Sequence, residues 1–302
     1  MLLSLVVSEG RLRPIWRALV FLVLVLFVLP WLLNAPTNLA WKFLHLEDSL
    51  NAAAVAFQET ELLIQALIAT ALFAFYEHRR IDGYGLPVAR ALGSSTWEGM
   101  AAGVFMAAIV AAGMLLLGGM QINGFATTGG ALAASALAWL GANIVIAVAE
   151  EFFFRSYVLQ TLWRSLGFWP ASIATTAVFV ALHYFFKQGE NIWDVITLVS
   201  LSLLMCDTVR RTGTLWFAVG FHVAFDYMQF FVIGTPNGAL VPVGRMLDVN
   251  FQGPAWLTGG VLGTEASLLM YPAIALVWLY VVVRYRDTPI WQPDPEVAPK
   301  RA

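Results

Sequence analysis

The stretch AEEFFFRSYV, residues 149–158, places Glu150, Glu151 and Arg155 inside a long apolar run. The run extends from about 133 to 163, which exceeds the ~20 residues that an apolar helix needs to cross a bilayer. We therefore expect this helix to tilt or to extend into the cytoplasm. Ionisable side chains inside a span cost roughly 2.5–3.5 kcal/mol for a central Asp, Lys or Arg. Three such residues in one helix indicate a function.

The composition outside this stretch predicts a membrane protein. Of the 302 residues, 60% are hydrophobic and 12% are charged, whereas soluble domains carry about 25% charged residues. We expect an all-α fold, a polytopic bundle of about eight transmembrane helices. The net charge of −2 suggests no nucleic-acid partner. The single cysteine, Cys206, excludes an internal disulfide and a C-x-x-C metal site.

The apolar runs and the basic residues between them predict the topology. Lys and Arg flank the spans mainly on one side, which places both termini in the cytoplasm, in a bacterial inner membrane. Residues 1–290 are expected to form one transmembrane domain with a motif core at about 131–233, and 291–302 a disordered cytoplasmic tail. Residues 234–264 read as an irregular external loop. The expected spans are 15–33, 52–76, 98–119, 133–163, 170–187, 192–209, 213–233 and 266–283.

The other ionisable residues inside spans are His183, His222 and Asp226. If spans four and five form a hairpin that turns near Gly167, Glu150 lies 17 residues before the turn and His183 lies 16 after it. At 1.5 Å per residue, both lie roughly 25 Å from the turn. His222, about ten residues into span seven, is expected at a comparable depth. Three separate spans can therefore bring these side chains into one layer.

Local spacing refines this picture. Glu151 and Arg155 are four residues apart and can pair on one helical face, while Glu150 is rotated by about 100° and stays available. His222 and Asp226 are also four apart, so the carboxylate can orient the imidazole or join it around an ion. Phe179 shares a face with His183 and could form the wall beside it.

Two kinds of chemistry suit such a cluster. A carboxylate in a desolvated pocket can act as a general base towards water. Alternatively, Glu150, His183, His222 and Asp226 could hold a divalent metal such as zinc with an open position for water. No Ser, Cys or Thr is placed as a nucleophile. A purely structural interpretation is also open, in which the Glu–Arg pair and the histidines only join helices.

At these residues the sequence resembles the CAAX protease and bacteriocin-processing family, also called the Abi family, of intramembrane proteases. EEFFFR, residues 150–155, matches the pattern E-E-x-x-x-R. FVALH, residues 179–183, matches F-x-x-x-H, and HVAFD, residues 222–226, matches H-x-x-x-N or its variant that ends in Asp. The resemblance covers about 145–230.

The resemblance implies peptide-bond hydrolysis within the membrane by an activated water. It implies that Glu150 is the base and that His183 helps to hold the water. His222 and residue 226 would stabilise the oxyanion, and Glu151 and Arg155 complete the candidate catalytic set. Asp226 departs from the prenyl-protein-processing members, which carry Asn. An ionised Asp cannot donate to an oxyanion, which leaves a role as metal ligand or as orienter of His222.

Three functions remain open from the sequence. The first is an intramembrane endopeptidase acting on a membrane-associated, prenylated or bacteriocin-like substrate, with membrane lipid and a peptide or protein as partners. The second is a proton-coupled transporter, since intramembrane Glu and His also form relays. Glu59 and Glu61, in span two, are further candidates for such a relay. They lie near the outer end of the span, so we expect them at the membrane interface. The third is a non-catalytic membrane scaffold or immunity protein.

Overall fold

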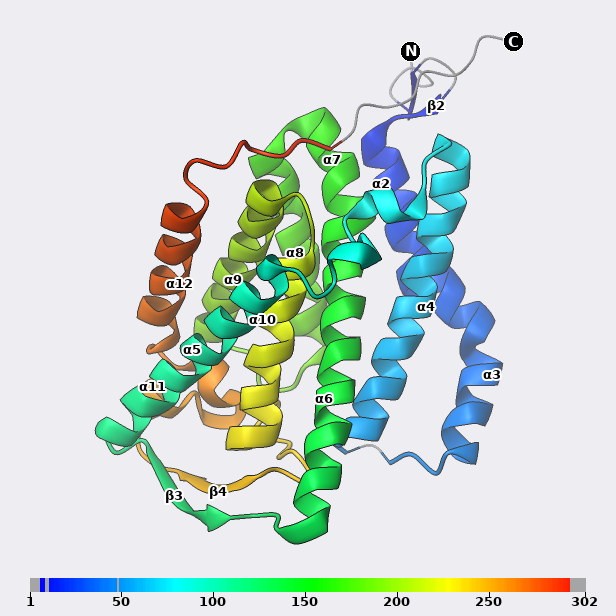
Figure 1. The fold of residues 1–302 in the computed structure, drawn as a ribbon. Helices are drawn as coiled ribbons and strands as arrows, with labels where there is room; N and C mark the ends of the chain where they lie inside the picture. The colour runs from blue at the N-terminus through cyan, green and yellow to red at the C-terminus, as the bar shows by residue number, and fades with distance from the viewer. Residues whose placement is uncertain (1–5, 9–10, 48, 294–302) are drawn as a thin grey trace.

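The computed structural model describes residues 6–8, 11–47 and 49–293. Within these residues, eight helical segments are long and apolar enough to cross a membrane, which confirms the predicted polytopic all-α bundle (Figure 1). The protein is an integral multi-pass membrane protein. The helices that build the segments are α2 (Pro14–Val23), η1 (Leu24–Val28), α3 (Leu29–Phe43), α4 (Ala52–Glu77), α5 (Ser94–Leu116), α6 (Gly129–Phe152), η4 (Phe153–Val158), α7 (Leu159–Leu166), α8 (Phe168–Phe186), α9 (Ile192–Thr212), α10 (Trp216–Asp226), η5 (Tyr227–Ile233), η6 (Gly260–Ala266) and α12 (Met270–Arg284).

The first span is longer than expected. Its apolar run was predicted to end at residue 33, but α3 continues to Phe43. Pro30 lies in the first turn of α3, directly after the π-helical segment η1. Proline is tolerated in a first turn, and the wider π turn supplies the break that its ring requires.

A helical ribbon of 38 residues, α6–η4–α7, forms the axis of the bundle. At 1.5 Å per residue it is about 57 Å long, which explains why the predicted span was too long for a simple crossing. It packs against α4 on one side and α10 on the other (Figure 1). The predicted hairpin is present, because Gly167 separates α7 from α8 with a φ of 83°, a conformation that favours glycine.

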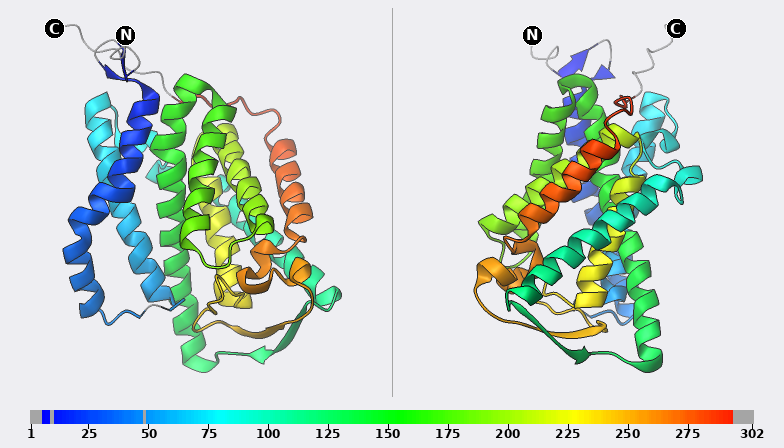
Figure 2. Two further views of the ribbon diagram at one scale, coloured as in Figure 1. Left: turned by 180° about the vertical axis from the view of Figure 1, so that it is seen from behind. Right: turned by 60° about the vertical axis from the view of Figure 1, so that its left-hand side comes forward.

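The loop at 234–264 is not wholly irregular. Its strand β4 (Leu247–Phe251) pairs antiparallel with β3 (Met120–Phe125), and the register shifts between Ile122 and Gly124. The ribbon lies at the end of the bundle opposite to the start of α2 (Figure 2). The sequence analysis missed β3, a short segment between two spans. The remaining short elements are β1 (Val7–Ser8), β2 (Arg11–Leu12), η2 (Ile81–Tyr84), η3 (Val88–Arg90) and α11 (Ala255–Thr258).

Glycines bring α5 and α10 into backbone contact. A Cβ on Gly99 or Gly103 would collide with the carbonyl oxygens of Phe217 and Phe221, and one on Gly220 would collide with the backbone of α5. Small residues of this kind let membrane helices approach closely. The position of α10 is therefore fixed by backbone rather than by adaptable side chains.

Glu77, at the end of α4, is the centre of a buried ionic cluster. Its carboxylate accepts hydrogen bonds from Arg17 Nη1 at 2.8 Å, Tyr157 Oη at 2.7 Å and Tyr84 Oη at 3.2 Å. Arg164 Nη1 lies 3.5 Å away. The cluster joins α2, α4, η2, η4 and α7 at the end of the bundle where α2 begins.

The predicted tail begins with a packed residue. The Trp291 ring lies 5.6 Å from that of Trp163 between centroids, and its backbone N–H donates to the carbonyl of Arg210. Residues 294–302, the greater part of the predicted tail, lie outside the described residues.

Candidate active site

The E-E-x-x-x-R motif spans the junction of α6 and η4. Arg155 Nη1 lies 3.1 Å from Glu151 Oε1, and both side chains are only 2% exposed. Arg155 also donates to the hydroxyl of Ser202 on α9 at 3.0 Å. The predicted i,i+4 pair is therefore present, and it ties the central helix to α9.

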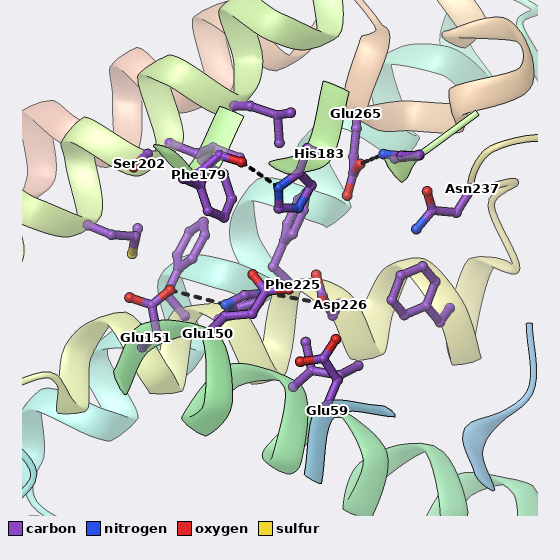
Figure 3. A pocket seen from close by; sticks show the side chains of 18 of the residues that line it. Glu59, Glu150, Glu151, Phe179, His183, Ser202, Phe225, Asp226, Asn237 and Glu265 are labelled. Carbon is purple, nitrogen blue, oxygen red and sulfur yellow. Dashed lines mark hydrogen bonds and ion pairs between the residues drawn. The ribbon is translucent and has the colours of Figure 1, made fainter. Parts of the chain in front are cut away.

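Glu150 points away from this pair and into a cavity (Figure 3). Its side chain is 16% exposed. Within the part of the chain that the structure describes, its carboxylate accepts no hydrogen bond, and His222 Nε2 lies 4.0 Å from its Oε2. A carboxylate that is held in a largely apolar wall with its oxygens uncommitted can interact with a bound water or a substrate.

His222, on α10, lies between carboxylates. Its Nδ1 is 3.1 Å from Glu151 Oε1, and its Nε2 is 3.3 Å from Asp226 Oδ2. The contact with Asp226 was predicted from the spacing, but the contact with Glu151 was not. A neutral imidazole donates through one nitrogen only, whereas an imidazolium donates through both. The arrangement thus suits a positively charged His222, oriented from both sides.

His183, on α8, reaches the same cavity. Its Nδ1 lies 2.9 Å from the backbone carbonyl of Phe179, which can only accept, so Nδ1 carries the proton. In the neutral ring Nε2 is then left as the acceptor. The Phe179 ring lies 4.2 Å from the imidazole between centroids and also beneath the Arg155 guanidinium at 5.1 Å. Phe179 therefore forms the wall that was expected beside His183.

Two adjoining cavities meet at these side chains. The first, of about 230 Å³, is lined by all six predicted catalytic residues: Glu150, Glu151, Arg155, His183, His222 and Asp226. The second, of about 650 Å³, shares Glu150 and His183 with the first and extends between α4 and α8. Three motifs that are far apart in the sequence thus line the same cavity, the first of the two.

Glu59, on α4, is a site residue that the sequence analysis missed. Glu59 lines both cavities, and Figure 3 shows it beside Glu150 and Asp226; its interfacial location stays a prediction. Its Oε2 is buried and has no hydrogen-bond partner among the described residues. A signal was present, since positions 59, 62, 66, 69 and 73 follow one helical stripe that ends in core residues.

Lys187 and Glu265 complete the far rim of the cavity. Lys187 Nζ lies 2.7 Å from Glu265 Oε2 and 3.8 Å from Asp194 Oδ2. Burial lowers the pKa of Lys187, but the carboxylates of Glu265, Asp194 and Glu190 raise it above its usual value, so the ammonium stays charged. Glu265 follows the predicted external loop, and nothing in the sequence connects it with His183.

The described residues do not form a ready metal site. Among them, no group of three or more His, Cys, Asp and Glu side chains is arranged to hold an ion. Both nitrogens of His222 face carboxylates, and one nitrogen of His183 is committed to a backbone carbonyl. The zinc expected from the donor types therefore remains a prediction.

Residues 132–228 match the family model described as type II CAAX prenyl endopeptidase Rce1-like. The match confirms the resemblance and includes all three motifs that line the cavity. It supports a CAAX-type intramembrane endopeptidase in general. No curated protein and no solved structure gave a significant match to the chain.

Proposed function

We propose that the protein is an intramembrane endopeptidase in which Glu150 activates a water that hydrolyses a peptide bond of a membrane-associated substrate. One observation carries the proposal. Glu150 presents an uncommitted carboxylate to a cavity that it shares with His183 and His222, from two other helices. Peptide hydrolysis requires a base, a polar site for water and positive charge near the developing oxyanion.

In the proposed reaction, Glu150 takes a proton from a water that His183 Nε2 helps to position. The resulting hydroxide attacks the carbonyl carbon, whose oxygen becomes an oxyanion. Glu150 then passes the proton to the leaving amine as the C–N bond breaks. Both proton transfers, from water to Glu150 and from Glu150 to the leaving amine, take place within the cavity in this scheme. Arg155 keeps Glu151 in place as a partner of His222.

In this scheme the positive charge of His222 stabilises the oxyanion electrostatically, because both ring nitrogens face carboxylates and are not free to donate to it. Asp226 Oδ2 lies 3.3 Å from His222 Nε2, so an ionised Asp226 orients the imidazolium through its charge and does not itself donate. Asp226 stands where the prenyl-protein-processing members carry Asn, and this role does not require Asp226 to be protonated. It also makes a substrate outside the prenylated class the better expectation.

Purified protein in proteoliposomes tests the proposal. Quenched fluorescent peptides of varied sequence would be added with and without chelator, and cleavage products identified by mass spectrometry. We expect cleavage by the wild type and none by Glu150→Gln. Proton flux without cleavage would favour a transporter instead, and the absence of both would favour a scaffold.

A further inference from the structure

The cavity lies close to one end of the bundle. Glu59 is seven residues from the first residue of α4, and His183 is three residues from the last residue of α8, which places both within about 10 Å of the same end. Leu50 and Asn237, from the loops at that end, also line the cavity. The β3–β4 ribbon lies at this end too (Figure 2).

The basic residues lie mainly at the other end. That end holds the Glu77 cluster and carries Arg11, Arg13, Arg17, Arg79, Arg80, Arg90, Arg164, Arg210, Arg211, Arg284 and Arg286. The end near the cavity carries Lys42, Lys187 and Arg245, of which Lys187 is paired with Glu265 and Arg245 lies 3.6 Å from Asp248. Because short cytoplasmic segments are enriched in Lys and Arg, the end near the cavity is the external one.

We infer that the active-site cavity opens at the extracytoplasmic face and receives a membrane-anchored polypeptide whose scissile bond is presented from that side. The substrate class is then a translocated or secreted chain with an apolar anchor, not a lipidated tail that remains in the cytoplasm. This inference rests on the proposed peptidase function for its substrate and on the charge distribution for its direction.

The second cavity fits such an anchor. From Glu59, Glu150 and His183 it runs between η1, α4 and α8, along apolar side chains contributed by Leu26, Leu62, Leu182 and Phe186. An apolar segment in this groove places the adjoining peptide bond beside Glu150.

Asn237 offers a contact for the polar part of the substrate. It lines both cavities, and its Oδ1 is buried without a hydrogen-bond partner among the described residues. A buried amide oxygen in this state costs free energy unless something donates to it. The backbone N–H of an extended peptide that enters from outside is a donor of the right kind.

Cysteine labelling tests the direction of the opening. In a Cys206→Ala background, which removes the only native thiol, Asn237→Cys reports the cavity and Ser165→Cys, exposed near the α7–α8 turn, is the matched control. A membrane-impermeant maleimide should label Asn237→Cys at least about tenfold faster in right-side-out vesicles than in inverted ones, and Ser165→Cys in the reverse order. Labelling of Asn237→Cys only in inverted vesicles would overturn the inference.

A second arm tests the substrate. A test protein with one apolar span would carry a peptide that the purified enzyme cleaves, placed at either the external or the cytoplasmic end of the span. We expect cleavage of the external placement only, and cleavage of the cytoplasmic placement alone would refute the inference. If the purified enzyme cleaves no peptide in detergent, the peptidase proposal itself fails, while labelling still decides the direction of the opening.

Discussion

Glu77 and Glu150 are carboxylates inside the same bundle, but their surroundings differ. Glu77 is 2% exposed, and two arginines and two tyrosines surround its oxygens. Glu150 faces a cavity and accepts no hydrogen bond from the described residues, with His222 at 4.0 Å. A carboxylate whose oxygens are all hydrogen-bonded or ion-paired holds helices together. A carboxylate that faces a cavity and accepts no hydrogen bond remains free to react. Burial alone does not distinguish a structural charge from a catalytic one.

The largest effect is expected at Glu150. The change Glu150→Gln keeps the shape of the side chain but removes the base, and general-base catalysis contributes about 10²–10⁴-fold. We expect cleavage to fall by about a thousandfold or more, with an unchanged melting temperature. Peptide cleavage and thermal unfolding would be measured on the same preparation. A Gln variant that cleaves at the wild-type rate would remove Glu150 from the mechanism.

Glu77→Gln is the matched change at the carboxylate whose oxygens are fully hydrogen-bonded. It removes the carboxylate charge that Arg17 Nη1 contacts at 2.8 Å, and breaking a buried pair costs about 3–5 kcal/mol in soluble proteins. We expect a lower yield and a lower melting temperature, but an unchanged rate per folded molecule. Thermal unfolding in detergent and active-site titration would show this. Loss of rate without loss of stability would mean that the two ends of the bundle are not functionally separate.

Asp226→Asn tests an intermediate case, a carboxylate that acts through another residue. Asn cannot supply the charge that orients His222, and hydrogen bonds to charged groups are worth about 1.5–3 kcal/mol. We expect cleavage to fall by about 10- to 100-fold across the pH range. Divalent metal content would be measured by mass spectrometry on the same samples, and a parallel loss of metal would favour the metal role. A fully active Asn variant, with no metal in the wild type, would restore the direct oxyanion role.

The smallest effect is expected at Glu59. Substitution there is expected to raise the stability of the protein, whereas substitution of Glu77 lowers it. Among the described residues Glu59 has no ion pair to lose, and a buried carboxylate oxygen without a partner is unfavourable. We expect Glu59→Gln to stabilise the protein by about 1 kcal/mol while it slows cleavage, as is common when active-site strain is relieved. A rise in melting temperature with reduced cleavage would be the signature. Destabilisation would show that Glu59 is structural.

The sequence predicted what depends on local geometry. The spacing of four residues predicted the contacts Glu151–Arg155 and His222–Asp226, because both members of each pair lie on one helix. Counting from Gly167 predicted that Glu150 and His183 reach the same depth, because both helices start from one turn.

The missed contacts depend on how distant helices are rotated against each other. Glu59 and Glu265 join the cavity from outside the motifs, and the bond between Glu151 and His222 joins residues 71 apart in the chain. No spacing within one helix encodes these rotations. The Glu77 cluster was missed for the same reason, since its partners come from four other elements.

The glycine contact between α5 and α10 also bears on when the candidate site is completed during synthesis of the chain. The contact joins Gly103 to Phe221, next to His222, so the imidazole reaches its place only after the seventh span has entered the membrane and docked. A ribosome-bound chain that has inserted α6 and α8 already carries Glu150 and His183 but lacks the charge that completes the site.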